Sequence, residues 1–180
     1  MFDISQAERI VIVGNGGSGK STLASRLEEI LQIPVLHLDK FFWQPGWRQP
    51  DPEWWRRKHN ELISRERWII DGSYSDTFLE RLKRSEAVIL LDFSTLCCLK
   101  NIIGRILRSY GQVRPDMAKG CAEKFDWEFI KWIWQFKSKN YPRIFSALSK
   151  CNMSDRCVIL KNRKSVNLFI KSLQQIKKPA

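Results

Sequence analysis

The stretch IVIVGNGGSGKSTLASRL, residues 10–27, carries the strongest structural signal in this chain of 180 residues. Aliphatic residues typical of a buried strand run directly into a turn with four glycines, and apolar residues at helical spacing follow the turn. The turn GNGGSGKS, Gly14–Ser21, fits the pattern G-x-x-x-x-G-K-[ST] of a phosphate-binding loop, or P-loop. Because a strand precedes it and a helix follows it, we expect a nucleotide site rather than a simple connecting turn.

The residue types of this loop suit a triphosphate. Glycines let the backbone curl so that successive N–H groups point at phosphate oxygens, and the helix N-terminus adds partial positive charge. Lys20 is expected to bridge the outer phosphates in a catalytic role, and the Ser21 hydroxyl is expected to bind Mg²⁺. ATP and Mg²⁺ are therefore the expected cofactors, held by Gly14, Asn15, Gly16, Gly17, Ser18, Gly19, Lys20, Ser21 and Thr22.

Strand and helix patterns alternate along the rest of the chain. Such alternation predicts an α/β fold in which helices cover both faces of a parallel sheet, here one three-layer P-loop NTPase domain with a five-stranded sheet. The expected strands are 10–13, 34–38, 68–70, 87–91 and 157–160. The expected helices are 18–31, 52–66 after an Asp51 N-cap, 75–84, 95–109, 125–140 with a break at Pro142 and resumption to 148, and 166–176.

Composition limits the class of protein. The length suits one domain, with two long connections: a helical insertion at about 40–66 and a lid-like loop at about 108–124. No apolar run approaches the ~20 residues of a membrane span, and the first ten residues lack a signal-peptide pattern. Five cysteines without a CxxC pair indicate free thiols and a cytoplasmic protein, and a structural zinc site is not expected.

The net charge of +12 raises the possibility of nucleic-acid binding. Residues 150–180 hold eight of the Lys and Arg residues and one Asp, so much of the excess lies at one end of the chain. Basic residues near a nucleotide cleft would also be explained by anionic nucleotides. Nucleic acid is therefore a possible but not the favoured partner beside ATP and a small-molecule acceptor, and nothing in the sequence indicates an oligomeric state.

The segment HLDKFFWQPGWRQP, residues 37–50, follows the second expected strand, where functional groups of parallel sheets collect. Asp39 is a candidate to orient or deprotonate an acceptor hydroxyl, with a helix-cap role as the alternative. His37 points the same way and is a second candidate, with a packing role as the alternative. Trp47 and neighbouring aromatic residues suit a planar or anionic acceptor, although we expect most of them to form the core of the insertion.

Two further segments offer chemistry. In WIIDGSY, residues 68–74, Asp71 is expected to hold Mg²⁺ through water, and Gly72 and Tyr74 are expected to line the acceptor side. Asp92, at the end of the next strand, is the alternative metal-side carboxylate. Arg105 lies near a helix end and Arg114 in the lid-like loop, and both are candidates to neutralise charge on the transferring group.

The P-loop together with HLD (37–39), PGW (45–47), WIIDGSY and RPDMAKGCAEKFDWEF (114–129) resembles the small, adenylate-kinase-like proteins called DNA topology modulation (FlaR-related) proteins. The resemblance extends to about Asn162. The order of features is also similar to nucleoside monophosphate kinases, including gluconate- and shikimate-kinase-like enzymes. This resemblance implies a nucleoside-kinase-like fold, Asp71 on the metal side, Arg105 as a catalytic arginine, and an adenine contact near Asn162 and Arg163.

One departure from this pattern concerns the acceptor. Monophosphate kinases follow the Asp-Gly pair with Phe-Pro-Arg, whereas this chain has Ser73-Tyr74-Ser75. The arginine that would hold an acceptor's phosphate is absent there, which argues against a nucleotide acceptor. Two functions remain: a kinase for a small molecule or nucleotide, which we favour, and a nucleotide-switched regulatory protein that acts on DNA.

Overall fold

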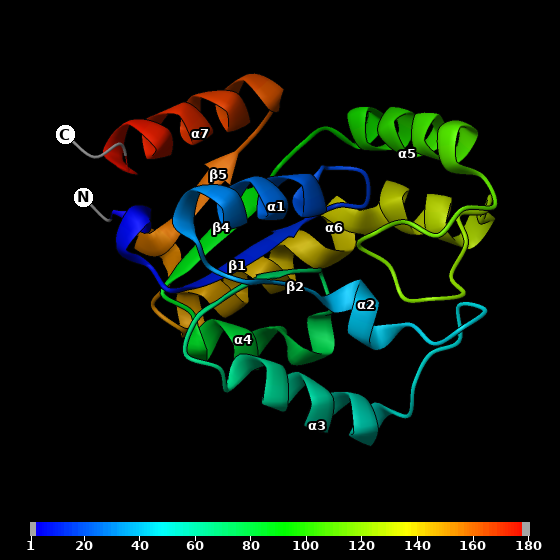
Figure 1. The fold of residues 1–180 in the computed structure, drawn as a ribbon, viewed down its shortest axis with the longest axis horizontal. Helices are drawn as coiled ribbons and strands as arrows, with labels where there is room; N and C mark the ends of the chain where they lie inside the picture. Colours follow the sequence, from blue (N-terminus) through cyan, green and yellow to red (C-terminus); the bar gives the residue numbers. More distant parts are fainter. Residues whose placement is uncertain (1–2, 178–180) are drawn as a thin grey trace.

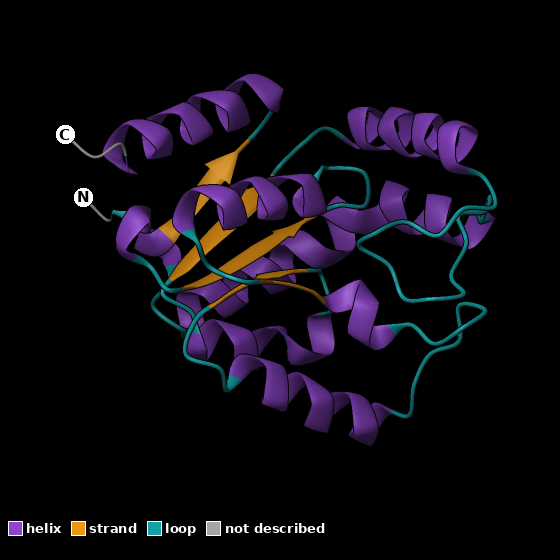
Figure 2. Ribbon diagram, in the orientation of Figure 1, coloured by secondary structure: helices purple, strands orange, loops and turns teal. Residues whose placement is uncertain are grey.

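The computed structural model describes residues 3–177 and contains one parallel sheet of five strands (Figures 1 and 2). The strand order is β2-β3-β1-β4-β5, so the strand that precedes the P-loop lies at the centre. This confirms the expected α/β fold with a five-stranded parallel sheet. The strands are β1 (Arg9–Gly14), β2 (Val35–His37), β3 (Trp68–Asp71), β4 (Ala87–Leu91) and β5 (Cys157–Leu160).

Helices cover both faces of the sheet (Figure 2). The longer helices are α1 (Lys20–Leu31), α3 (Pro52–Ile63), α5 (Thr95–Ser109), α6 (Trp127–Lys150) and α7 (Arg163–Lys177). The shorter ones are α2 (Leu38–Phe42) and α4 (Phe78–Arg84), with 3-10 turns η1 (Ile4–Gln6), η2 (Ser75–Thr77) and η3 (Ser154–Arg156).

Alternate residues of the strands divide the core into two layers. Ile10 and Ile12 of β1 pack with α1, α5 and α7 on one face. Val11 and Val13 of the same strand pack with α3, α4 and α6 on the other. This division follows from the two-residue period of a strand, and it leaves the carboxyl end of β1 between two helical layers.

Several boundaries differ from the sequence prediction. The predicted break at Pro142 is wrong, because α6 continues through it to Lys150. Proline costs an interior helix about 3 kcal/mol, and the burial of Phe136 on one side of it and Ile144 on the other offsets that cost. The end of the predicted strand 34–38 is also wrong, since Leu38 begins helix α2. The predicted cap is confirmed: the Asp51 side chain accepts a hydrogen bond from Trp54 N at 2.8 Å.

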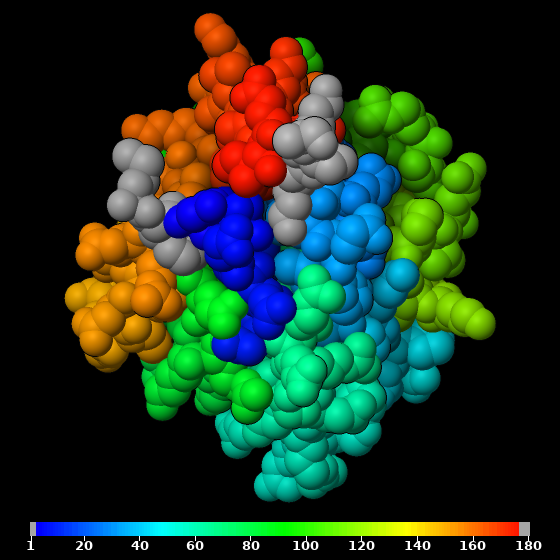
Figure 3. Space-filling model, turned by 60° about the vertical axis from the view of Figure 1, so that its left-hand side comes forward, coloured from blue at the N-terminus to red at the C-terminus, as the bar shows by residue number. Residues whose placement is uncertain are grey.

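Much of the basic C-terminal segment forms helix α7, which crosses the molecule. This helix starts near the P-loop end of the sheet and runs to the opposite end, where it packs beside η1 and α1 (Figures 1 and 3). Of its basic residues, Arg163 and Lys164 lie at the P-loop end, and Lys171 and Lys177 lie farther along the helix. Lys178 lies outside the described residues. Within residues 3–177, no helix combines the length and apolarity that crossing a bilayer requires.

Candidate active site

The P-loop has the shape that its glycines predict. Gly14 and Gly17 have φ values of 151° and 76°, and an added Cβ would lie 2.7 Å from Leu91 O and 2.4 Å from Cys98 O, respectively. Neither position can accept a side chain without moving backbone. Gly19 also has a positive φ of 91° but an open surrounding, and it directly precedes the first residue of α1.

Polar side chains fix this loop from several elements. Within the loop, the Asn15 side chain donates to Ile133 O of α6 at 2.9 Å, and Ser18 Oγ donates to Asn15 O at 2.7 Å. From outside the loop, Ser73 Oγ donates to Gly14 O at 2.8 Å, and Asn101 donates to Gly17 O at 2.8 Å. Gly16 lies against Phe129 and Ile133, whereas Thr22 is exposed.

Lys20 lies over the loop. Its ammonium donates to the carbonyl oxygens of Gly14 and Asn15, each at 3.0 Å. Burial lowers the pKa of Lys20, and the negative charges of Asp71 and Asp39 oppose that shift. The ammonium is thus placed where a phosphate held by the loop would meet it.

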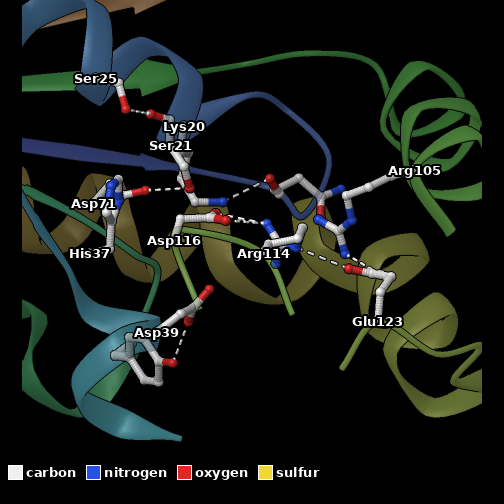
Figure 4. Close-up of polar contacts among 12 residues, drawn as sticks. Lys20, Ser21, Ser25, His37, Asp39, Asp71, Arg105, Arg114, Asp116 and Glu123 are labelled. Carbon is white, nitrogen blue, oxygen red and sulfur yellow. Dashed lines mark hydrogen bonds and ion pairs between the residues drawn. The ribbon is translucent and has the colours of Figure 1, made fainter. Parts of the chain in front are cut away.

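Ser21 and Asp71 meet beside Lys20 (Figure 4). The Ser21 hydroxyl donates to Asp71 Oδ2 at 2.8 Å, and His37 Nδ1 lies 2.7 Å from Asp71 Oδ1. A hydroxyl and a carboxylate oxygen suit Mg²⁺, which prefers hard oxygen ligands and completes its shell with water and phosphate oxygens. Burial raises the pKa of Asp116 of the lid-like loop, but the charge of Arg114 and the Ser21 side chain outweigh it and lower the pKa, so a second carboxylate lies near the same place.

The alternative carboxylate, Asp92, is engaged elsewhere. It accepts hydrogen bonds from Lys137 Nζ at 2.5 Å and Tyr141 Oη at 2.6 Å, both on α6. Burial raises the pKa of Asp92, but the hydrogen bonds of Lys137 and Tyr141 outweigh it and lower the pKa. The geometry therefore favours Asp71 over Asp92 as the metal-side residue.

The Asp39 carboxylate lies beyond β2, in the first turn of α2. Tyr74 Oη donates to Asp39 Oδ1 at 2.5 Å. Burial raises the pKa of Asp39, although the Tyr74 hydrogen bond and the positive charge of Lys20 counteract the shift. Gly72 has a φ of 140°, and a Cβ there would lie 3.0 Å from Leu38 Cβ, so this position also requires glycine.

Arg105 and Arg114 are brought together by one buried acid. Arg105 NH2 donates to Glu123 Oε1 at 2.8 Å, and Arg114 Nε donates to Glu123 Oε2 at 3.0 Å (Figure 4). Arg114 also binds Asp116 Oδ2 at 2.7 Å. Burial and the charge of Arg114 lower the pKa of Arg105, with Glu123 opposing them. These contacts tie the lid-like loop to α5 through Glu123.

Trp47 joins the insertion to the lid-like loop. Its indole N–H donates to Ala122 O at 2.9 Å, and its ring packs with Trp43 against Met117, Ala118 and Cys121. Gly46 N also donates to Gly120 O at 3.0 Å. Packing therefore accounts for this tryptophan, in line with the expected share of the aromatic residues.

Asn162 and Arg163 lie at the start of α7. The Asn162 side chain accepts a hydrogen bond from Ser165 N at 2.9 Å, and Arg163 donates to Asn101 Oδ1 at 3.2 Å. Because Asn101 also contacts Gly17 O, this corner adjoins the P-loop. Both side chains are exposed there, and an adenine contact remains an expectation.

Sequence reasoning missed Asp116, Glu123 and Ser73 as site residues. Asp116 and Glu123 lie in a segment whose arginines were noticed, and an acid placed near two arginines of one loop was the available signal. Ser73 follows the Asp-Gly pair directly, but no pattern indicated its bonds to Gly14. Ser73 binds Gly14, 59 positions away, and Glu123 binds Arg105, 18 positions away, so the fold is needed to reveal these contacts.

The ion pair of His37 with Asp71 makes stability depend on pH. Burial lowers the pKa of His37, but the hydrogen bond and charge of Asp71 outweigh it and raise the pKa above 6.5. The stabilising contribution is therefore present below the unfolded pKa and lost as pH rises through the folded pKa. We expect the melting-temperature difference between the native protein and His37→Gln to be larger at about pH 5.5 than at about pH 8.5. Thermal denaturation at both pH values measures it, and a difference that grows with pH contradicts the pairing.

Comparison with known proteins supports the fold. No family model matches the chain, and no curated protein matches it in sequence. A solved shikimate kinase from Bacteroides thetaiotaomicron aligns with a TM-score of 0.57 at 20% identity, covering 94% of this chain and 98% of that chain. A shikimate kinase from Acinetobacter baumannii, solved with shikimate, aligns with a TM-score of 0.59 at 19% identity, covering 96% and 94%. The chain therefore has the P-loop α/β fold of these proteins.

Proposed function

We propose that this protein is an ATP-dependent kinase that transfers the γ-phosphoryl group to a hydroxyl of a small-molecule acceptor. One arrangement carries the proposal. Asp39, which accepts from Tyr74 Oη at 2.5 Å, lies two residues after His37, and His37 contacts the same Asp71 that accepts from Ser21 of the P-loop, so a candidate proton acceptor adjoins the phosphate site. Similar folds belong to shikimate kinases, which supports this reaction type. The acceptor itself is not proposed to be shikimate.

Each of the site residues has its own role in the proposed transfer. The loop amides and Lys20 hold the phosphates, and Ser21 with Asp71 would hold Mg²⁺, which neutralises phosphate charge when bound. Asp39 orients the acceptor hydroxyl and accepts its proton as its oxygen bonds to the γ-phosphorus. The bond from that phosphorus to ADP breaks, and Arg105 and Arg114 balance the charge that develops.

The Asp39 role predicts a defect in turnover. Asp39→Asn keeps the size of the side chain but cannot accept the proton, so kcat should fall about a hundredfold while the KM for ATP changes little. Glu80→Gln, a substitution of another acid on the same half of the molecule, serves as the control. Steady-state kinetics measure both, and an Asp39→Asn enzyme with native kcat removes Asp39 from the reaction.

A panel of acceptors tests the activity itself. ADP release is followed with Mg²⁺ and ATP while nucleoside monophosphates, polyols and cyclic hydroxy acids are added one at a time. Stimulation above the acceptor-free rate by one class supports the kinase and identifies its substrate. ATP binding without stimulation by any class favours the regulatory alternative, in which the nucleotide acts as a switch.

Two finer assignments accompany this proposal. We propose membership of the topology modulation family, on the motifs that resemble it, and a cytoplasmic location, on the five cysteines, all of which are free in the structure. We also propose an adenine contact near Asn162 and Arg163, as the resemblance implies.

A further inference from the structure

A groove on α6 has no part in the proposed reaction. It has a volume of about 830 Å³ and lies between α6 and the turn η2, where Ser75 forms its far side. Two tryptophans, three cations and one acid line the groove: Trp127, Trp132, Lys131, Lys139, Arg143 and Glu128. A cationic groove with indole walls is thus formed beside the nucleotide site.

The tryptophans are held in fixed positions. Trp132 stacks on Phe129 with ring centroids 5.8 Å apart and an interplanar angle of 14°, and Phe129 itself adjoins Gly16 of the P-loop. Trp127 stacks on Phe125 at 6.4 Å and 28°. Even so, 38% of Trp132 and 70% of Trp127 remain exposed, so ring surface is open to the groove. Exposed aromatic residues gathered in one concave place are typical of a binding site.

The charge of the groove points to an anionic ligand. Helix α6 contains five Lys or Arg residues and one Glu. Among the described residues, Lys131, Lys139 and Arg143 form no ion pair with a carboxylate, in contrast to Lys137, which binds Asp92. Lys139 and Arg143 are four residues apart, and Lys131 lies eight residues before Lys139, so the three follow one ridge along the helix. A row of unpaired cations fits a chain of negative charges.

We propose that this groove binds single-stranded nucleic acid, with bases stacked on Trp127 and Trp132 and phosphates on Lys131, Lys139 and Arg143. Indole rings suit bases of any identity because every base has a π-face, and a cationic row follows the backbone. The two tryptophans are five residues apart, or about 7.5 Å along the helix axis, which leaves room for a separate base on each. A duplex hides its base faces and does not match this arrangement. This site is separate from the proposed acceptor site and does not require phosphoryl transfer.

Fluorescence anisotropy of a labelled thymidine oligonucleotide of about eight nucleotides tests the site. Binding should be measurable at about 50 mM salt, and log K should fall with log salt with a slope of about −2, from three phosphate contacts. Trp127→Ala should weaken binding about tenfold, since it removes one stacking platform. Lys139→Ala should weaken binding and reduce the slope by about 0.7.

Matched controls come from the same helix. Trp134 is 62% exposed but does not line the groove, and Lys150 is exposed near its end, so Trp134→Ala and Lys150→Ala should leave binding unchanged. Because Trp127 and Lys139 lie outside the core, their variants should melt like the native protein. The proposal is overturned if the folded protein does not bind at low salt, if Trp134→Ala weakens binding as much as Trp127→Ala, or if a duplex or thymidine monophosphate binds as tightly as the single strand. Kinase activity with a small molecule would not alter any of these outcomes.

Discussion

Replacing Lys20 with alanine is expected to lower kcat/KM for acceptor-dependent ADP release by about a thousandfold, or about 4 kcal/mol of transition-state stabilisation. The reason is that the Lys20 ammonium, which donates to Gly14 O and Asn15 O at 3.0 Å, is the cation that lies over the P-loop. Negative charge on the transferring group would then lose its nearest fixed partner, in a partly buried place where such interactions are strong.

Two measurements separate this effect from misfolding. Lys100→Ala removes an exposed lysine of α5 and should keep native kinetics. Calorimetry with ATP and Mg²⁺ should show weakened binding for Lys20→Ala, while its melting temperature without nucleotide stays near the native value. A Lys20→Ala protein that keeps activity within about tenfold of the native enzyme would remove the P-loop from the reaction.

The central part of the fold could be predicted because its signals are local. The P-loop, its strand and its helix occupy consecutive residues, and the β-branched runs that form β4 and β5 have the predicted bounds. Helix α2 was missed because its five residues, Leu38–Phe42, are too few to show a helical period. The continuity of α6 was missed because the tertiary burial that offsets Pro142 is invisible in a local window.

The site was less predictable, since its residues meet across long separations. Asp71 and Asp39 could be named because strand ends converge at one edge of a parallel sheet. Glu123 could not, because its role depends on Arg105 of α5 approaching it in space. The preference for Asp71 over Asp92 was already indicated by the sequence, and the contacts of Lys137 and Tyr141 with Asp92 support it.

Arg81 was also not identified from the sequence. In the structure it is an unusual, buried cation. Its guanidinium is fully buried and donates to Thr77 Oγ1 at 2.9 Å, Tyr74 O at 3.2 Å and Gly72 O at 3.3 Å. Burial lowers its pKa to about 10. No ion pair with a carboxylate accompanies it among residues 3–177. The His59 ring, with Nε2 at 3.4 Å from Arg81 NH1, and the Phe78 ring, with its centroid at 5.6 Å, complete the surroundings of the guanidinium. Arg81 thereby fixes the segment after β3, which contains the tyrosine that binds Asp39.

Arg81→Met should therefore destabilise the protein by about 3 kcal/mol, because the hydrogen bonds of the guanidinium are lost and only part of that loss is offset by relief from burying the cation. For a domain of this size the melting temperature should fall by about 6–12 °C. Arg84→Met, an exposed arginine of the same helix, should change stability by less than about 0.5 kcal/mol. Thermal denaturation followed by circular dichroism compares the two variants. Equal melting temperatures would mean that the carbonyls of Gly72 and Tyr74 are satisfied without Arg81, and that this arginine does not hold the acceptor-side segment in place.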